Sequence, residues 1–130
     1  MAKYTKFFAY LDSNSISEAG GKGAQLGELI KAKIKVPPGF VVLADAFERF
    51  LEETDLGVDI EAQLKKVNFK DTNAVDRYSN VIRDLIHDFE IPADISKEIL
   101  ASFDRLKCQY VAVRSSATAE DSSVASWREN

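Results

Sequence analysis

Residues 72–89 carry the longest apolar face in the sequence, and the need to bury that face constrains the fold more than any other feature. Six side chains repeat at helical spacing over four turns: Val75, Tyr78, Ile82, Leu85, Ile86 and Phe89. A helix with such a face must pack against another element. The continuous apolar run Tyr110–Val113 is typical of a buried interior strand. We therefore expect residues 72–89 to form a helix that packs on a sheet containing residues 110–113.

The first part of the sequence predicts two further strands with a helix between them. Tyr4–Leu11 and Phe40–Leu43 are short, apolar and bounded by polar or turn-forming residues. Between them, Leu26, Leu29 and Ile30 have the spacing of an amphipathic helix. The "VPPG" segment that follows must end this helix, because proline lacks a backbone donor and disfavours helical geometry before it.

Three more helices are expected in addition to residues 72–89. One begins at Asp45, with Glu48 in the spacing of a capping box, and a weaker one covers residues 60–67. Pro92 starts a helix whose apolar face runs from Ile95 to Leu106. Strands that alternate with helices predict an α/β (α+β) fold, a mixed sheet covered by several helices, with residues 1–130 as a single domain.

Composition excludes several classes of protein. A net charge of −4 without a basic stripe argues against nucleic-acid binding, and no apolar run approaches the ~20 residues of a membrane span. The first residues do not resemble a signal peptide. The single cysteine, Cys108, excludes an internal disulfide and fits a reducing cytoplasm, so we expect a cytoplasmic location. His87 lies off the apolar face of its helix and is interpreted as a surface residue.

The glycine-rich segment "GGKG" at residues 20–23 is the first candidate binding site. Glycine permits positive φ and close approach to a ligand, and the unpaired N–H groups at the start of the following helix favour an anion. Lys22, flanked by Gly21 and Gly23, adds a mobile charge suited to phosphate. The segment matches neither a Walker A loop nor the dinucleotide-binding fingerprint. An ordinary glycine-rich turn with a solvated lysine stays an alternative.

The second candidate site is the polar segment that begins at Arg114. Arginine at the end of an apolar strand either pairs with a structural carboxylate or faces a ligand crevice, where guanidinium binds phosphate bidentately. The hydroxyls of Ser115, Ser116 and Thr118 can complete such a site. The alternative is a polar tail without a ligand. Glu120 and Asp121 are candidate Mg²⁺ ligands or a solvated charge cluster.

Together these segments resemble a known enzyme family. The stretches "GGKGAQLGEL", "VPPGFVV", "ADAFERFL" and "VAVRSSATAEDSSVASW" occur in the order found in the phosphoenolpyruvate synthase and pyruvate phosphate dikinase family. They resemble the amino-terminal part of its ATP-binding domain. The resemblance covers residues 18–127 and implies an ATP-grasp-like fold with ATP in a cleft between two subdomains.

The resemblance also implies roles for individual residues. Lys22 and Arg114 match the family's phosphate-binding lysine and arginine. In the family, ATP and Mg²⁺ serve to phosphorylate a histidine on a separate swivelling domain, which passes the phosphoryl group to pyruvate. Phosphoryl transfer needs such cationic clamps, because negative charge develops on the transferred group.

The resemblance is partial, which leaves more than one function open. Arg128–Asn130 stand where the family continues with Ala-Gly-Gln, and the second ATP-grasp half, the histidine domain and the pyruvate domain are expected to be absent. We therefore expect an ATP-binding fragment that is inactive alone and works with the remaining domains of a parent enzyme. One alternative is a free-standing module that senses nucleotide or phosphate, or that docks onto a separate protein carrying the remaining domains. The other is a structural domain whose glycine and serine segments have lost ligand binding.

Overall fold

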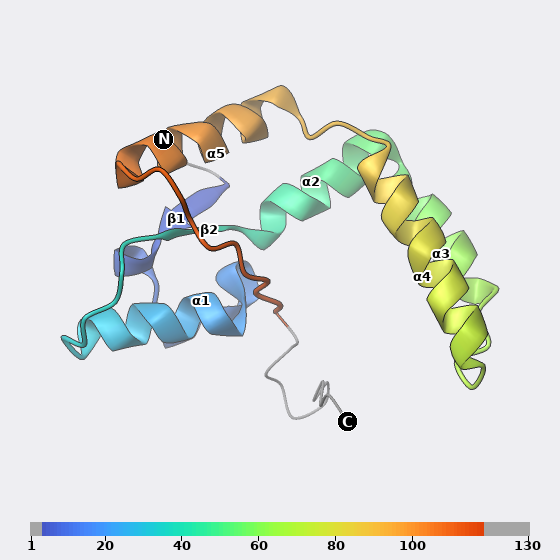
Figure 1. Ribbon diagram of the computed structural model, residues 1–130, viewed down its shortest axis with the longest axis horizontal. Helices are drawn as coiled ribbons and strands as arrows, with labels where there is room; N and C mark the ends of the chain where they lie inside the picture. Colours follow the sequence, from blue (N-terminus) through green and yellow to red (C-terminus); the bar gives the residue numbers. More distant parts are fainter. Residues whose placement is uncertain (1–3, 119–130) are drawn as a thin grey trace. The chain divides into compact units, whose positions relative to one another are not determined.

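The computed structural model describes residues 4–118 and divides them into two compact units. Unit 1 contains the described residues up to Ala46 and from Ala93 onward, and unit 2 is Phe47–Pro92 (Figure 1). The elements are β1 (Thr5–Phe7), η1 (Phe8–Tyr10), η2 (Ser13–Ser15), α1 (Ile16–Lys31), β2 (Phe40–Val42), α2 (Ala44–Thr54), α3 (Leu56–Lys65), α4 (Thr72–His87) and α5 (Ala93–Leu106). Helices combined with a small sheet confirm the predicted α/β class.

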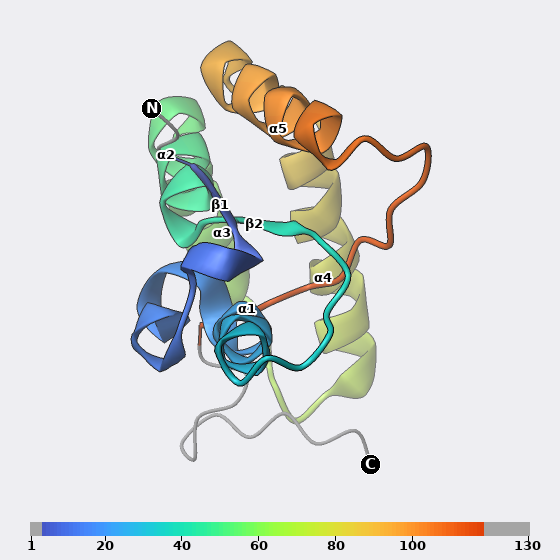
Figure 2. The same ribbon diagram turned by 90° about the vertical axis from the view of Figure 1, so that its left-hand side faces the viewer.

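The sheet of unit 1 consists of β1 and β2, which pair antiparallel. Phe7 lies opposite Phe40, and their rings are 5.7 Å apart. β1 is shorter than the predicted strand Tyr4–Leu11, because the chain turns into the 3-10 helix η1 at Phe8. A two-stranded sheet is marginally stable on its own. Here it lies between α5 and α1, which cover its two sides (Figures 1 and 2).

Both covering helices are fixed to the sheet region by specific contacts. The core under α1 contains the fully buried Leu11 together with Ala19 and Leu43. On the other side, the buried hydroxyls of Thr5 and Ser102 lie 2.8 Å apart and join β1 to α5. A buried polar pair of this kind is stable because each group satisfies the other.

The end of α1 depends on one backbone conformation. Lys33 adopts a positive φ of 61°, and the amide N–H of Ile34 donates to the carbonyl oxygen of Leu29. The left-handed conformation just past the helix turns the following N–H groups back, so that they donate to carbonyl oxygens of the last turn. The helix therefore ends at Lys31, before the "VPPG" segment that was predicted to break it.

Unit 2 contains a helical hairpin in which α3 and α4 pack side by side (Figure 1). Leu56 at the start of α3 is fully buried. Asp71 caps α4, because its carboxylate accepts hydrogen bonds from the backbone N–H groups of Asn73 and Ala74. α4 ends at His87, which is exposed as predicted, so Phe89 lies outside the helix.

Two other predicted helix boundaries were wrong. α2 begins at Ala44, so Asp45 lies in its first turn, where a carboxylate still interacts favourably with the helix dipole, and does not cap it. α3 covers Leu56–Lys65, so it starts four residues and ends two residues before the predicted range 60–67. Both errors concern where a helix starts, which depends on the turn before it.

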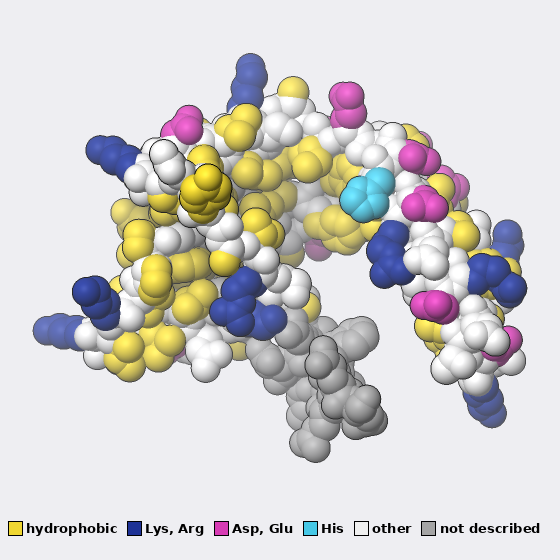
Figure 3. All heavy atoms as spheres, viewed as in Figure 1, with side chains coloured by type: hydrophobic (Ala, Val, Ile, Leu, Met, Phe, Trp, Pro, Cys, Tyr) yellow, Lys and Arg dark blue, Asp and Glu magenta, His cyan; other side chains and the backbone are white. Residues whose placement is uncertain are grey.

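The predicted strand Tyr110–Val113 is also wrong for the structure described. These residues form no strand, and Tyr110 and Val113 are 88% and 92% exposed. A strand needs a neighbour for its hydrogen bonds, and within residues 4–118 the sheet contains only β1 and β2. The prediction that residues 72–89 pack on this strand fails because the strand does not form; within unit 2, α4 packs on α3. Hydrophobic side chains are accordingly visible on the surface of unit 1 (Figure 3).

Candidate functional site

The glycine segment lies within α1, at a sharp break in that helix. Gly20 has a φ of 80° and a ψ of 170°, a conformation that only glycine adopts readily. A Cβ at this position would overlap the side chain of Ser116 and lie 2.8 Å from its carbonyl carbon. Gly20 is therefore required twice, for its positive φ and for the close approach of a distant segment. The break separates the first turn of α1 from the part that carries Lys22.

The distant segment is anchored to the break by three hydrogen bonds. The hydroxyl of Ser116 donates to the carbonyl oxygen of Ala19 at 2.7 Å and accepts from the backbone N–H of Gly23 at 3.2 Å. The N–H of Gly21 donates to the carbonyl oxygen of Ala117 at 3.2 Å. Figure 2 shows the segment after α5 looping outward and returning to α1. The two candidate sites predicted from sequence thus lie side by side.

The structure places the two predicted phosphate-binding cations near each other. Lys22 is half-buried between two anchored glycines, and Arg114 is exposed two residues before the anchored Ser116. Covalent geometry together with the 3.2 Å hydrogen bond limits their Cα separation to at most about 15 Å. Ser115 and Thr118 are exposed, and Thr118 is the last residue described.

One part of the sequence interpretation needs correction. The helix start after the glycines was expected to offer unpaired N–H groups to an anion. In the structure two of these groups, at Gly21 and Gly23, already donate to the segment of Ser116 and Ala117. The reason is that two nonlocal partners, a hydroxyl and a carbonyl oxygen, satisfy donors that a helix start leaves without intrahelical partners.

Sequence reasoning missed the role of Gly27, which belongs to the same helix. A Cβ on Gly27 would overlap the carbonyl group of Leu11, and a Cβ on Gly23 would lie 3.0 Å from the side chain of Val41. Gly23 and Gly27 are four residues apart in the part of α1 after the break at Gly20, so they lie on one face of that part. That spacing was visible in the sequence. It lets the helix lie directly on buried backbone.

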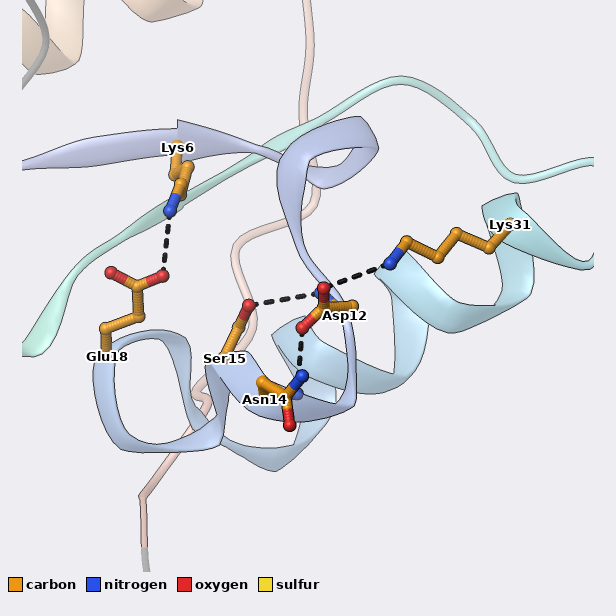
Figure 4. A network of polar contacts seen from close by, with 6 residues as sticks. All are labelled: Lys6, Asp12, Asn14, Ser15, Glu18 and Lys31. Atoms are coloured by element: carbon orange, nitrogen blue, oxygen red, sulfur yellow. Dashed lines mark hydrogen bonds and ion pairs between the residues drawn. The ribbon is translucent and has the colours of Figure 1, made fainter.

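A polar network holds both ends of α1 (Figure 4). The carboxylate of Asp12 accepts from Lys31 Nζ at 3.0 Å and from the N–H of Asn14 at 2.8 Å. These bonds, above all the one from Lys31, lower the pKa of Asp12. Near the start of the helix, Lys6 Nζ lies 2.9 Å from the carboxylate of Glu18. The helix that carries Lys22 is therefore tied to the segment before it.

The described residues contain neither a metal cluster nor a membrane span. Within residues 4–118, no group of three or more His, Cys, Asp or Glu side chains could hold a metal ion. No helix in this range is long and apolar enough to cross a membrane. The candidate ligands Glu120 and Asp121 lie outside the residues described.

Comparison with known families identifies the domain to which these residues belong. Residues 16–128 match the model of the family "Pyruvate phosphate dikinase, AMP/ATP-binding domain". The chain belongs to this family. The match spans the Gly20 break and the Arg114 segment, so the resemblance expected from sequence is confirmed. The site described above lies in an AMP/ATP-binding domain of the phosphoenolpyruvate synthase and pyruvate phosphate dikinase family.

Relatives of this AMP/ATP-binding domain are phosphoenolpyruvate synthases. A probable phosphoenolpyruvate synthase of Methanothermobacter thermautotrophicus is 44% identical over 128 residues, which cover 93% of this chain and 19% of the relative. The probable enzyme of Methanocaldococcus jannaschii is 44% identical over 126 residues, covering 89% of this chain and 10% of the relative. The phosphoenolpyruvate synthase of Helicobacter pylori is 36% identical over 129 residues, with coverages of 92% and 16%. The chain thus spans a fifth or less of the length of these relatives.

Proposed function

We propose that this domain binds ATP through its phosphates, with Lys22 and Arg114 as the two cationic clamps. Gly21, Gly23 and the hydroxyl residues Ser115, Ser116 and Thr118 line the site, the last three along the Arg114 segment. The observation that carries the proposal is the anchoring of this segment on both sides of Lys22. Two cations held at one place suit the charge of a polyphosphate.

We further propose that the domain works within a phosphoenolpyruvate synthase-like phosphotransferase. ATP bound here supplies a phosphoryl group to a histidine on another domain of the same enzyme, and that domain delivers it onward to an acceptor such as pyruvate. Lysine and arginine at the phosphates favour this step, because they stabilise charge on the transferred group. Support comes from the phosphoenolpyruvate synthases among the relatives.

Several further properties belong to the proposal. Residues 1–130 act as the amino-terminal portion of an ATP-grasp-like nucleotide-binding domain, with the rest of the parent enzyme as partner, in the cytoplasm. Alone they do not convert pyruvate, because the histidine and pyruvate domains that the family implies lie outside the matched region. The exposed His87 of α4 is not the phosphorylated histidine. In the full-length family Mg²⁺ would accompany ATP, and we propose that residues 1–130 alone bind this ion weakly or not at all.

Nucleotide binding is tested by titrating ATP into the ¹⁵N-labelled chain and following amide chemical shifts. Exposed charge pairs contribute little, and association itself is costly, so we expect a dissociation constant on the order of millimolar or weaker. Shifts should cluster at residues 21–24 and 114–117. Lys22→Ala and Arg114→Ala should each weaken binding, whereas Lys35→Ala, which removes an exposed lysine outside the site, should not.

Two outcomes would contradict the proposal. Shifts confined to other residues, or micromolar binding unaffected by both substitutions, would show that the phosphates bind elsewhere. Formation of phosphoenolpyruvate by the purified chain from ATP, Mg²⁺ and pyruvate would refute the expected inactivity. Inorganic triphosphate in place of ATP separates phosphate binding from recognition of the nucleoside.

A further inference from the structure

The hydroxyl of Ser116 is fully engaged with α1. A serine hydroxyl has a single hydrogen to donate, and that hydrogen goes to the carbonyl oxygen of Ala19 at 2.7 Å. The same oxygen accepts from the N–H of Gly23 at 3.2 Å. While these contacts persist, Ser116 has no hydrogen left for a phosphate oxygen. Any contribution of this hydroxyl to a phosphate site must therefore be indirect.

We infer that Ser116 is a positioning residue, which holds Arg114 beside Lys22 by anchoring the arginine segment to the break in α1. The inference rests on the proposed function of Lys22 and Arg114 as phosphate clamps. It assigns different roles to these residues: Lys22 and Arg114 contact the ligand, and Ser116 sets the distance between Lys22 and Arg114.

The contacts around Lys22 support this role. Gly21 and Gly23 precede and follow Lys22 directly, and both donate to the arginine segment, one to the carbonyl oxygen of Ala117 and one to Ser116. The anchoring hydrogen bonds thus flank Lys22 on both sides along the chain. Ser116 can approach the break in α1 this closely because Gly20 has no side chain; a Cβ there would collide with Ser116.

The rest of the arginine segment depends on this anchor. Residues 107–118 form no helix or strand, and the residues from Lys107 to Ser115 are exposed. Exposed backbone without secondary structure opens easily. Without the Ser116 hydroxyl, Arg114 would sample many positions and lose the entropy advantage of being held near Lys22.

A double-mutant cycle on ATP affinity tests the inference. If Ser116 acts only by placing Arg114, then Ser116→Ala and Arg114→Ala should each weaken ATP binding about two- to fivefold, the range of an exposed charge pair. The double variant should be no weaker than either single variant, since both remove one interaction. Ser116→Thr, which keeps the hydroxyl, should restore affinity, and Ser17→Ala, which removes an exposed hydroxyl elsewhere on α1, should have no effect. If the two effects instead multiply, Ser116 contacts the phosphate directly and the inference is wrong.

A second measurement needs no ligand. In Ser116→Ala, and in the nearly isosteric Ser116→Cys if the alanine variant folds poorly, the heteronuclear NOE of residues 114–117 should fall and the Gly23 amide should exchange faster. Order in these residues that is unchanged without the hydroxyl would overturn the inference, whether or not ATP binds. A chain that fails to respond to ATP at residues 21–24 and 114–117, while the anchor behaves as expected, refutes the proposed function and with it the positioning role.

Discussion

Replacing Gly27 with alanine should destabilise unit 1, although alanine is the better helix former. A Cβ on Gly27 would overlap the carbonyl carbon and oxygen of Leu11 and lie 2.7 Å from the Leu11 Cβ. Carbon atoms prefer about 3.5–4.0 Å, so α1 would have to move by roughly 1 Å. The obstacle is backbone of a fully buried residue, which cannot rotate away as a side-chain end could.

The two opposing effects can be compared in magnitude. Overpacking a tight contact costs about 1–3 kcal/mol, and backbone overlap belongs at the upper end. The higher helix propensity of alanine over glycine stabilises the helix by about 1 kcal/mol. We therefore expect Gly27→Ala to lower the free energy of unfolding by about 2 kcal/mol, which corresponds to roughly 10 °C in Tm for a domain of this size.

Gly57→Ala is the matched control, because nothing lies within 4 Å of a Cβ placed on Gly57 in α3. The same chemical change should there stabilise the helix, by up to about 1 kcal/mol. Urea denaturation followed by circular dichroism measures both variants, and amide exchange in α1 and α3 assigns each effect to its unit. An unfolding free energy of Gly27→Ala equal to or above that of the unsubstituted chain would refute the reasoning.

Three further predictions concern unit 1. Gly20→Ala should destabilise the chain by about 1–3 kcal/mol in denaturant titration, because alanine is strained at positive φ and collides with Ser116; wild-type stability would show that the break relaxes. The pKa of Asp12 lies below its ordinary value of 3.8, so its stabilising effect is present above that pH and lost as the pH falls through the lowered pKa. Asp12→Asn should therefore lower Tm near neutral pH, and the Tm difference from the unsubstituted chain should shrink as the pH falls through the lowered pKa; a difference that stays constant with falling pH would contradict this. Ser102→Ala leaves the buried Thr5 hydroxyl without its partner and should cost about 1–3 kcal/mol, whereas the added change Thr5→Val should cost less than the sum of the two single changes.

Helices were predictable from sequence because their hydrogen bonds and side-chain faces are local. The apolar stripe of residues 72–89 corresponds to α4, and Pro92 with its following stripe corresponds to α5. Their boundaries were less predictable, as the start of α3 shows. There Asp55 takes a positive φ of 54°, which no periodicity indicates.

For the candidate site, too, the residues were predictable from sequence but the contacts between them were not. Lys22 and Arg114 stand out in the sequence as cations beside glycine and hydroxyl residues, and the order of the surrounding motifs is enough to indicate the family. That the segments of these two residues contact each other could be proposed from sequence only through the family resemblance. The structure supplies the physical link, which is the hydroxyl of Ser116 between two segments about ninety residues apart.

The sequence by itself determined the helical faces, the glycine-rich and arginine segments, and the family to which the chain belongs. Only the tertiary structure decided that residues 110–113 form no strand and are exposed, that Gly20 breaks α1, and that Gly27 lies on the backbone of Leu11. The reason is the range of the interactions. A helix satisfies its backbone from residues four positions away, whereas a strand or a close backbone contact depends on a partner that local pattern does not specify.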